Sequence, residues 1–174
     1  VNIFIALSHL KIIYLDFQLD TNNKEFQDAL QLITHTCQSV FLTGKAGTGK
    51  STFLKYICNH TKKKYVVLAP TGIAAINAGG VTLHSFFKLP FRPMLPDDPD
   101  LSLSHGRIFE FFKYPKEKRK IIAEVDLIII DEISMVRAAF IDCVDRILRG
   151  YSGNMRLPFG GKQLLFVGAV FQLE

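Results

Sequence analysis

A glycine-rich segment that follows an apolar run constrains the fold of this chain more than any other feature of its sequence. Residues 44–51 read GKAGTGKS and fill every fixed position of the pattern G-x-x-x-x-G-K-[ST]. The run before them, residues 39–42, predicts a buried strand, and residues 52–58 predict the helix that follows. This context is the one that the phosphate-binding pattern requires, so the sequence predicts a site for a nucleoside triphosphate.

The composition of this loop explains how it would hold a phosphate chain. Glycine accepts positive φ and lets backbone N–H groups approach an anion closely, and the N-terminus of the next helix adds free N–H donors. We expect Lys50 to contact the β- and γ-phosphates of ATP and Ser51 to ligate Mg²⁺. The other candidate ATP-binding residues of the loop and the helix start are Gly44, Ala46, Gly47, Thr48, Gly49 and Thr52.

Short apolar runs alternate with helical patterns along the chain. The apolar runs are residues 40–43, 65–69, 127–130 and 163–167. The helical patterns cover residues 24–36, 51–60, 73–78 and 135–148. Continuous apolar runs indicate strands that are buried on both faces. The sequence therefore predicts an α/β fold, a three-layer P-loop domain with a mainly parallel sheet and helices on both sides.

Composition favours one soluble globular domain with a polyanionic partner. The 174 residues are 48% hydrophobic and 21% charged, which is enough to bury a sizeable core. The net charge of +5 favours a partner such as nucleic acid. Cys37, Cys58 and Cys143 are far apart and lack the spacing of metal ligands. We expect them to be small hydrophobic core residues in a cytoplasmic, reducing environment.

The first 19 residues form an apolar segment of their own. Lys11 and Asp16 interrupt it, and it is too short for a comfortable membrane span. It also lacks the basic start and the cleavage site of a secretory signal. We expect an extra strand or helix packed on the domain, and no membrane partner. The predicted organisation is residues 1–19 as this segment and residues 20–174 as one nucleotide-binding domain.

Two basic runs and a proline-rich segment lie outside the predicted nucleotide site. The basic runs are residues 116–120 and 62–64, and each is interpreted either as a solvated face or as a contact with DNA. Prolines recur at every third position between residues 90 and 99, which predicts an extended surface segment.

An apolar run that ends in two acids supplies the second half of the predicted site. Residues 127–132 read LIIIDE. In α/β sheets, ligands bind at the carboxyl ends of the strands, where these two acids would emerge. We expect Asp131 to hold Mg²⁺ and Glu132 to polarise the water that attacks the γ-phosphorus. Together with the phosphate-binding loop, this pair predicts hydrolysis of the nucleotide.

Four ordered blocks carry a resemblance to a known family. They read APTGIAA at residues 69–75, VTLHSFF at 81–87, DEISMV at 131–136 and PFGGKQ at 158–163. With the phosphate-binding loop, they resemble the PIF family of superfamily-one DNA helicases over residues 20–174. The resemblance implies the first RecA-like motor domain of an ATP-dependent 5′-to-3′ DNA helicase. It also implies single-stranded DNA and a second motor domain as partners, and we expect a monomer.

The resemblance also assigns roles to single residues. Gln27 stands where the family reads adenine, and Gln172 where it senses the γ-phosphate, so the candidate catalytic residues are Lys50, Glu132 and Gln172. The blocks that line the DNA track in the family contain Thr71, Gly72, Thr82, His84, Ser85 and Phe86. There, hydroxyl and amide groups would hold phosphates and Phe86 would contact bases. His84 is open to a second interpretation, a structural histidine that forms hydrogen bonds.

The chain departs from the family pattern in three places. Phe26 stands before Gln27 where an acid is usual, and Ala169 stands where the family usually has Asp. Ala169 thereby removes a carboxylate from the motif of the phosphate sensor, which leaves the coupling of hydrolysis to DNA open. The chain also stops at Glu174, before a second motor domain. Because that domain supplies an arginine worth about 10³–10⁵ in rate, we expect this chain alone to hydrolyse ATP very slowly and not to unwind DNA.

Two other functions remain open on the sequence. One is a non-catalytic remnant that binds nucleotide or DNA, which Ala169 and the end at Glu174 favour. The other is a P-loop ATPase outside the helicases, for which the blocks of the DNA track would be coincidental. Binding of single-stranded DNA and turnover of ATP distinguish the three.

Overall fold

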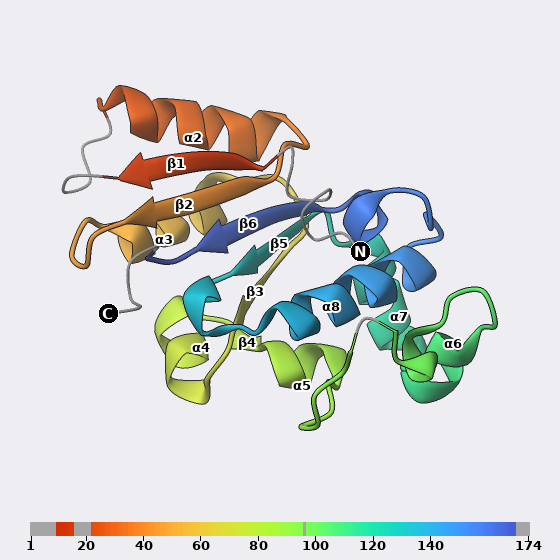
Figure 1. The fold of residues 1–174 in the computed structure, drawn as a ribbon. Coiled ribbons are helices and arrows are strands. Elements are labelled where there is room, and N and C mark those ends of the chain that lie inside the picture. The colour runs from red at the N-terminus through yellow and green to blue at the C-terminus, as the bar shows by residue number, and fades with distance from the viewer. Residues whose placement is uncertain (1–9, 16–21, 96, 170–174) are drawn as a thin grey trace.

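A six-stranded parallel sheet forms the centre of the molecule. The computed structural model describes residues 10–15, 22–95 and 97–169 (Figure 1). The strands are β1 (Lys11–Leu15), β2 (Val40–Gly44), β3 (Tyr65–Ala69), β4 (Val81–Thr82), β5 (Leu127–Ile130) and β6 (Gln163–Val167). They lie in the order β1-β2-β6-β5-β3-β4, and every neighbouring pair is parallel. The carboxyl ends of all strands therefore lie at one edge of the sheet.

Helices cover both faces of this sheet. They are α2 (Lys24–His35), α3 (Lys50–His60), α4 (Gly72–Ala78), α5 (Leu83–Phe87), α6 (Arg107–Phe111), α7 (Lys116–Glu124) and α8 (Ala138–Tyr151), with 3₁₀ turns at Pro99–Leu101, Ile133–Met135 and Pro158–Gly161. Figure 1 shows α8 in front of the sheet and α3 behind it. Along β5, Leu127 and Ile129 join the core under α2 and α3, whereas Ile128 and Ile130 join the core under α5 to α8. This alternation, expected of a strand, confirms the predicted three-layer α/β fold.

The helices lie where the apolar periodicity predicts them, except that the last helix starts and ends later than expected. In α2, Asn23 accepts a hydrogen bond from the Glu25 amide at 2.7 Å and caps the helix. The last helix was expected at residues 135–148 but spans Ala138–Tyr151. Residues 133–135 form a separate 3₁₀ turn instead, because the chain must first reverse after β5.

The described part of the N-terminal segment belongs to the same sheet. β1 pairs with β2 in parallel, with Lys11 opposite Val40 and Leu15 opposite Gly44. Residues 1–9 and 16–21 lie outside the described ranges. Within those ranges, the structure contains no helix with the length and apolar character needed to cross a membrane.

The three cysteines differ in their surroundings, which corrects one prediction. Cys143 is buried in α8 with its Sγ 3.8 Å from Met94 Sδ, as expected of a core residue. Cys58 is only half-buried, and Cys37 is exposed. The prediction for Cys37 is wrong because α2 ends at His35 and leaves this residue in the following loop.

The basic run at residues 62–64 forms contacts within the domain. Lys63 Nζ donates hydrogen bonds to Ile33 O at 2.7 Å, near the end of α2, and to Gln163 Oε1 at 2.5 Å, at the start of β6. Burial lowers the pKa of Lys63, and these acceptors stabilise its ammonium. Lys64 forms an exposed ion pair with Glu124 at 2.8 Å. Lys63 therefore joins three elements, and its side chain is not directed at an external partner.

Candidate nucleotide-binding site

The two halves of the predicted nucleotide site lie at the same edge of the sheet. The glycine-rich loop leaves β2 after Gly44, and Asp131 and Glu132 leave β5 after Ile130. β6 lies between these two strands. Gly168, at the end of β6, donates its amide to Leu42 O at 3.1 Å. A Cβ at Gly168 would lie 3.0 Å from Ile133 Cγ2, so the edge is closely packed here.

The backbone of the glycine-rich loop has the conformation that an anion site needs. Gly47 and Gly49 have φ values of 80° and 84°, in the left-handed region that favours glycine. Gly49 is also the N-cap of α3, and no side chain caps this helix. The first amides of α3 are therefore donors that a phosphate group can use.

Side chains of the glycine-rich loop form hydrogen bonds with its own backbone. Lys50 Nζ donates to Gly44 O at 2.7 Å and to Lys45 O at 2.8 Å. Thr48 Oγ1 donates to Lys45 O at 2.8 Å, and the Thr48 side chain is buried. Ser51 and Thr52 are exposed at the start of α3. Lys50 thus lies over the loop, where an incoming phosphate would meet its ammonium.

Burial dominates the surroundings of the Asp131 carboxyl. Burial raises the pKa of Asp131, and this rise is partly offset by the hydrogen bond from the Glu132 amide, at 2.9 Å, and by the charge of Lys50. Both groups follow parallel strands to the same edge of the sheet, so the charge of Lys50 can act on this carboxyl. A carboxyl with a perturbed pKa beside a lysine is a common property of active sites.

Glu132 has a backbone conformation that the sequence did not reveal. Its φ of 51° and ψ of 43° lie in the left-handed region, which costs a residue with a side chain about 1–3 kcal/mol. Such strain is retained mainly at functional sites. Glutamate has no special preference for positive φ, so no local signal in the sequence could have identified this turn.

The side chains present fit a magnesium ion. Within the described ranges, no three His, Cys, Asp or Glu side chains form a metal-binding group. Asp131 and the Ser51 hydroxyl would therefore supply one carboxylate and one hydroxyl, with phosphate oxygens and water completing the shell. Mg²⁺ prefers this kind of set, because it keeps several waters and binds through few carboxylates together with substrate phosphates.

The buried carboxyl of Asp131 leads to a prediction for stability. Asp131→Asn is expected to stabilise the nucleotide-free protein by about 0.5–2 kcal/mol, which raises Tm by about 2–4 °C per kcal/mol. The amide carries no charge that burial would penalise, and its oxygen still accepts from the Glu132 amide. Thermal melts measure the gain, and the same variant should bind Mg-ATP more weakly than the wild type.

The gain should depend on pH in a defined direction. Because the folded-state pKa of Asp131 is raised, its ionised form destabilises the fold at neutral pH, and this penalty disappears as the pH falls through the folded-state pKa toward the unfolded-state value. The difference in Tm should therefore shrink as the pH is lowered from neutral toward the ordinary pKa of an aspartate. Asp28→Asn, on the exposed face of α2, is the control and should show no gain. A lower Tm for Asp131→Asn at neutral pH would contradict the assignment.

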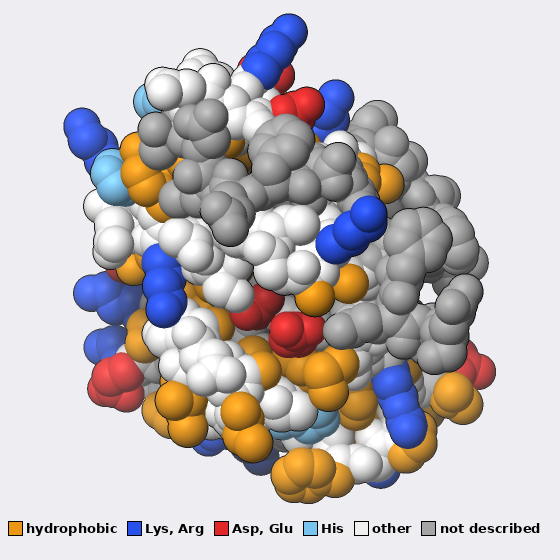
Figure 2. Space-filling view, turned by 90° about the vertical axis from the view of Figure 1, so that its left-hand side faces the viewer, with side chains coloured by type: hydrophobic (Ala, Val, Ile, Leu, Met, Phe, Trp, Pro, Cys, Tyr) orange, Lys and Arg blue, Asp and Glu red, His pale blue; other side chains and the backbone are white. Residues whose placement is uncertain are grey.

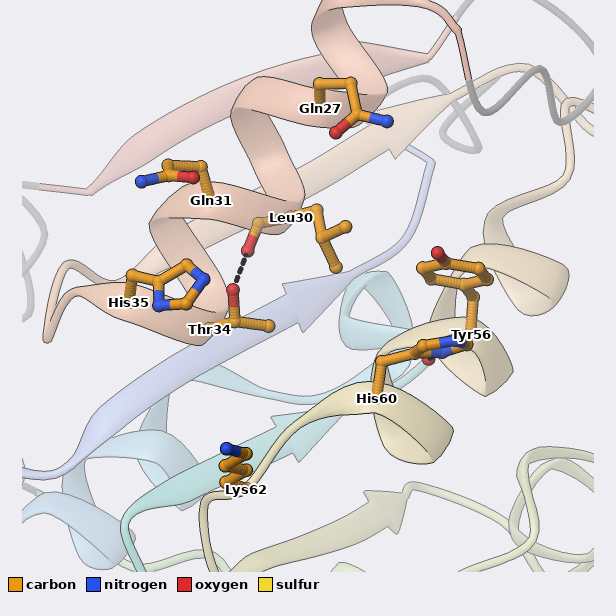
Figure 3. A pocket seen from close by; sticks show the side chains of 8 residues that line it. All are labelled: Gln27, Leu30, Gln31, Thr34, His35, Tyr56, His60 and Lys62. Atoms are coloured by element: carbon orange, nitrogen blue, oxygen red, sulfur yellow. Dashed lines mark hydrogen bonds between the residues drawn. The ribbon is translucent and has the colours of Figure 1, made fainter.

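Gln27 lies on the wall of a groove between α2 and α3. The groove has a volume of about 530 Å³. Its lining residues, drawn in Figure 3, are Gln27, Leu30, Gln31, Thr34, His35, Tyr56, His60 and Lys62. The Tyr56 and His60 rings stack with their centroids 3.9 Å apart. Phe26, which replaces the expected acid, is buried against Phe53 with ring centroids 4.9 Å apart. Phe26 therefore fixes α2 on α3 and leaves Gln27 exposed beside the groove.

Two candidate DNA-contacting threonines cap short helices. Thr71 Oγ1 accepts from the Ala74 amide at 3.2 Å, and Thr82 Oγ1 accepts from the Ser85 amide at 3.1 Å. Each hydroxyl keeps its own proton for a further acceptor. Thr71, Gly72 and Ser85 are exposed, and Thr82 is half-buried. α4 and α5, which carry these residues, follow β3 and β4 at the same edge as the nucleotide site.

The predicted base contact of Phe86 is corrected by the structure. Its side chain is only 6% exposed, in the core beneath α5, and Lys118 Nζ lies 4.0 Å from the ring centroid. A buried ring offers no free face to a base, because α5 turns this residue toward the sheet. We therefore remove Phe86 from the candidate DNA-contacting residues.

His84 contacts other rings. Its centroid lies 5.7 Å from that of Phe91, with nearly parallel planes, and 4.6 Å from that of Phe140 in an edge-to-face arrangement. No hydrogen bond from its ring to another described residue is present, so the structure gives no support to the alternative of a hydrogen-bonding structural histidine. Sequence reasoning missed Phe91, because one phenylalanine in a proline-rich loop carries no signal of its own.

The predicted coupling motif lies at the C-terminal end of the described residues, which stop at Ala169. Gln172 lies outside the described residues, so its predicted contact with the γ-phosphate stays a prediction. Ala169 is described and half-buried just after β6. It brings no carboxylate to this edge of the sheet.

Comparison with known proteins gives consistent results. The family described as PIF1-like helicase matches residues 18–174. The ATP-dependent DNA helicase PIF1 of Candida albicans is 38% identical over 142 residues, which cover 78% of this chain and 14% of that protein. The ATP-dependent DNA helicase PIF1 of Saccharomyces cerevisiae is 34% identical over 155 residues, which cover 84% of this chain and 16% of that protein.

Solved structures agree in fold. The crystal structure of Bacteroides sp Pif1 in complex with ADP-AlF4 matches with a TM-score of 0.77 and 45% identity, over 90% of this chain and 34% of that one. Bacteroides Pif1 bound to ssDNA matches with a TM-score of 0.75 and 45% identity, over 90% of this chain and 33% of that one. The chain thus spans about a sixth of the length of these curated relatives and about a third of the solved chains.

Proposed function

Because the chain belongs to the PIF1-like helicase family, we propose that it is the ATP-binding first motor domain of an ATP-dependent DNA helicase. One observation carries the proposal: the Lys50 loop and the Asp131–Glu132 pair follow β2 and β5 to one edge of the sheet, on either side of β6. A loop that binds phosphate beside an acid pair has the parts needed for phosphoryl transfer to water.

Each residue of the site has a role in this proposal. The amides of residues 45–50 and the Lys50 ammonium hold the β- and γ-phosphates, and Ser51 and Asp131 hold Mg²⁺. When bound, the ion neutralises charge that develops on the phosphate oxygens. Glu132 orients the attacking water and accepts its proton. Gln27 contacts adenine at the groove beside α2.

The DNA side of the proposal rests on neighbouring elements. Thr71, Gly72, Thr82, His84 and Ser85 contact single-stranded DNA through hydroxyl, amide and ring groups on α4, β4 and α5. The ssDNA-bound Bacteroides Pif1 structure, which shares this fold, supports single-stranded DNA as the ligand. Movement in the 5′-to-3′ direction, with Gln172 as the γ-phosphate sensor, would require the second motor domain as a partner.

Binding of single-stranded DNA tests the proposal. Fluorescence anisotropy with labelled oligo(dT) should show binding that weakens steeply between about 50 and 200 mM salt, because contacts with phosphates release counterions. Three to four neutralised phosphates predict a slope of log K against log salt of about −2 to −3. Binding of a fluorescent ATP analogue with Mg²⁺ is measured in parallel. Tight nucleotide binding without DNA binding would favour the alternative of a non-catalytic remnant that binds nucleotide.

A further inference from the structure

The Phe91 side chain is exposed to solvent, although residues on both sides of it in the chain are buried. Its side chain is 95% exposed, in the loop between α5 and the 3₁₀ turn Pro99–Leu101. Single exposed apolar residues are common and need no explanation by themselves. What distinguishes Phe91 is that Leu89 and Met94, on either side of it, are 4% and 0% exposed. The loop therefore cannot turn Phe91 inward without pulling these two residues out of the core.

An arginine beside Phe91 fixes the loop further. Arg92 Nη1 lies 2.7 Å from Asp98 Oδ2, and Arg92 Nη2 lies 2.8 Å from Asp100 Oδ2. The same guanidinium lies 5.5 Å from the centroid of the Phe111 ring. Exposed ion pairs contribute little to stability, but two carboxylates on one guanidinium define the direction of the loop. The ring of Phe91 is thus pre-organised in an exposed position.

Phe91 belongs to a group of rings beside the candidate DNA-contacting residues. The nearly parallel rings of Phe91 and His84 form what we term the aromatic step, and Phe140 supports His84 edge-on. Figure 2, which faces the carboxyl ends of the strands, shows hydrophobic side chains gathered below a central acidic pair, with a histidine among them. A flat apolar ring placed on Phe91 would extend a stack that already exists.

Two lysines lie close to one another around α5, the helix that carries His84. Lys88 ends α5 in the left-handed conformation, with φ of 51°, three residues before Phe91. Lys118 lies over the Phe86 ring, and burial, followed by the nearby charge of Lys88, lowers its pKa. Neither lysine forms an ion pair with any residue in the described ranges. Two neighbouring cations without a carboxylate favour an anion from outside the chain.

We propose that the aromatic step stacks one base of a single-stranded nucleic acid and that Lys88 and Lys118 hold an adjacent phosphate. This inference rests on the proposed function and adds residues that the family blocks do not contain. A ring and a phosphate contact are the two elements by which single strands are bound without sequence preference. The site should therefore accept any base and should discriminate against a strand that lacks bases.

Substitution of Phe91 tests the aromatic step directly. Because the ring is exposed, Phe91→Ala should leave Tm unchanged and weaken oligo(dT) binding by the 174-residue chain by about 5-fold or more, as expected for one lost base stack. Phe91→Trp should restore the affinity. Leu95→Ala removes a side chain that is 62% exposed on the same loop, and this control should change nothing.

Abasic DNA separates stacking from other effects. The wild type should bind an abasic strand more weakly than oligo(dT), and Phe91→Ala should bind the two with nearly equal affinity. Lys118→Ala should instead weaken both strands alike and reduce the salt slope by about 0.7, the value for one phosphate on a single strand.

The outcomes distinguish this inference from the proposed function. If the wild type binds oligo(dT) and Phe91→Ala binds it equally well, the aromatic step is refuted and the proposed function stands. An unchanged preference for bases in Phe91→Ala would refute it as well. If the wild type binds no single-stranded DNA, both fail.

Discussion

Lys50→Ala is expected to lose at least about 30-fold in affinity for Mg-ATP while the fold remains intact. Removing one partner of a charged hydrogen-bonded contact costs about 2–5 kcal/mol, of which the lower value corresponds to that factor. The fold should tolerate the change, because the partners of Lys50 among the described residues are two carbonyl groups of its own loop, Gly44 O and Lys45 O. Titration with a fluorescent ATP analogue measures the affinity, and thermal melting verifies the fold.

A matched lysine on the same helix provides the control. Lys55 is exposed on α3, and Lys55→Ala removes the same charge from the same element. It should keep the affinity of the wild type within about 2-fold, because surface charges away from the site contribute little. If both variants weakened binding equally, Lys50 would act through the overall charge of the protein, and its assignment to the phosphates would be wrong.

Glu132→Gln is expected to bind Mg-ATP normally and to lose hydrolysis. General base catalysis contributes about 10²–10⁴ in rate, and an amide cannot accept the proton of the attacking water. Gln has the same shape as Glu, so it should keep the left-handed backbone of this position and the hydrogen bond from its amide to Asp131 Oδ1. Single-turnover measurements with oligo(dT) present, followed to long times, would resolve slow hydrolysis.

The same exchange outside the site serves as the control for Glu132. Glu124 ends α7 and forms an exposed ion pair with Lys64. Glu124→Gln should leave both binding and turnover unchanged. Turnover at the wild-type rate in Glu132→Gln would show that another group accepts the proton, and it would leave Glu132 as a residue that shapes the turn after β5.

The agreement between sequence and structure follows from where the strands lie. The predicted strands at residues 65–69, 127–130 and 163–167 match β3, β5 and β6 at both ends. A strand buried on both faces must be apolar at every position, so its limits can be read in the sequence. The conformation of the glycine-rich loop can also be predicted from the sequence. Positive φ at Gly47 and Gly49 depends on the glycines themselves.

Residue exposure was less predictable than secondary structure. Phe86 and Phe91 are five positions apart, yet one is 6% and the other 95% exposed. The first faces the sheet from α5, whereas the second is held outward by the burial of Leu89 and Met94. No periodicity distinguishes them, because the contacts that decide exposure come from distant parts of the chain. The prediction for Cys37 was wrong because this residue lies in the loop after α2 with its side chain exposed.

The sequence by itself determined the elements, the phosphate-binding loop and the acid pair, because each depends on residues that are neighbours in the chain. Only the tertiary structure decided that β6 lies between β2 and β5. It also decided that Glu132 adopts the left-handed conformation and that the Asp131 carboxyl is partly buried. These features arise from strand order, packing and charge at short distance in space, and contacts between residues far apart in sequence leave no local pattern.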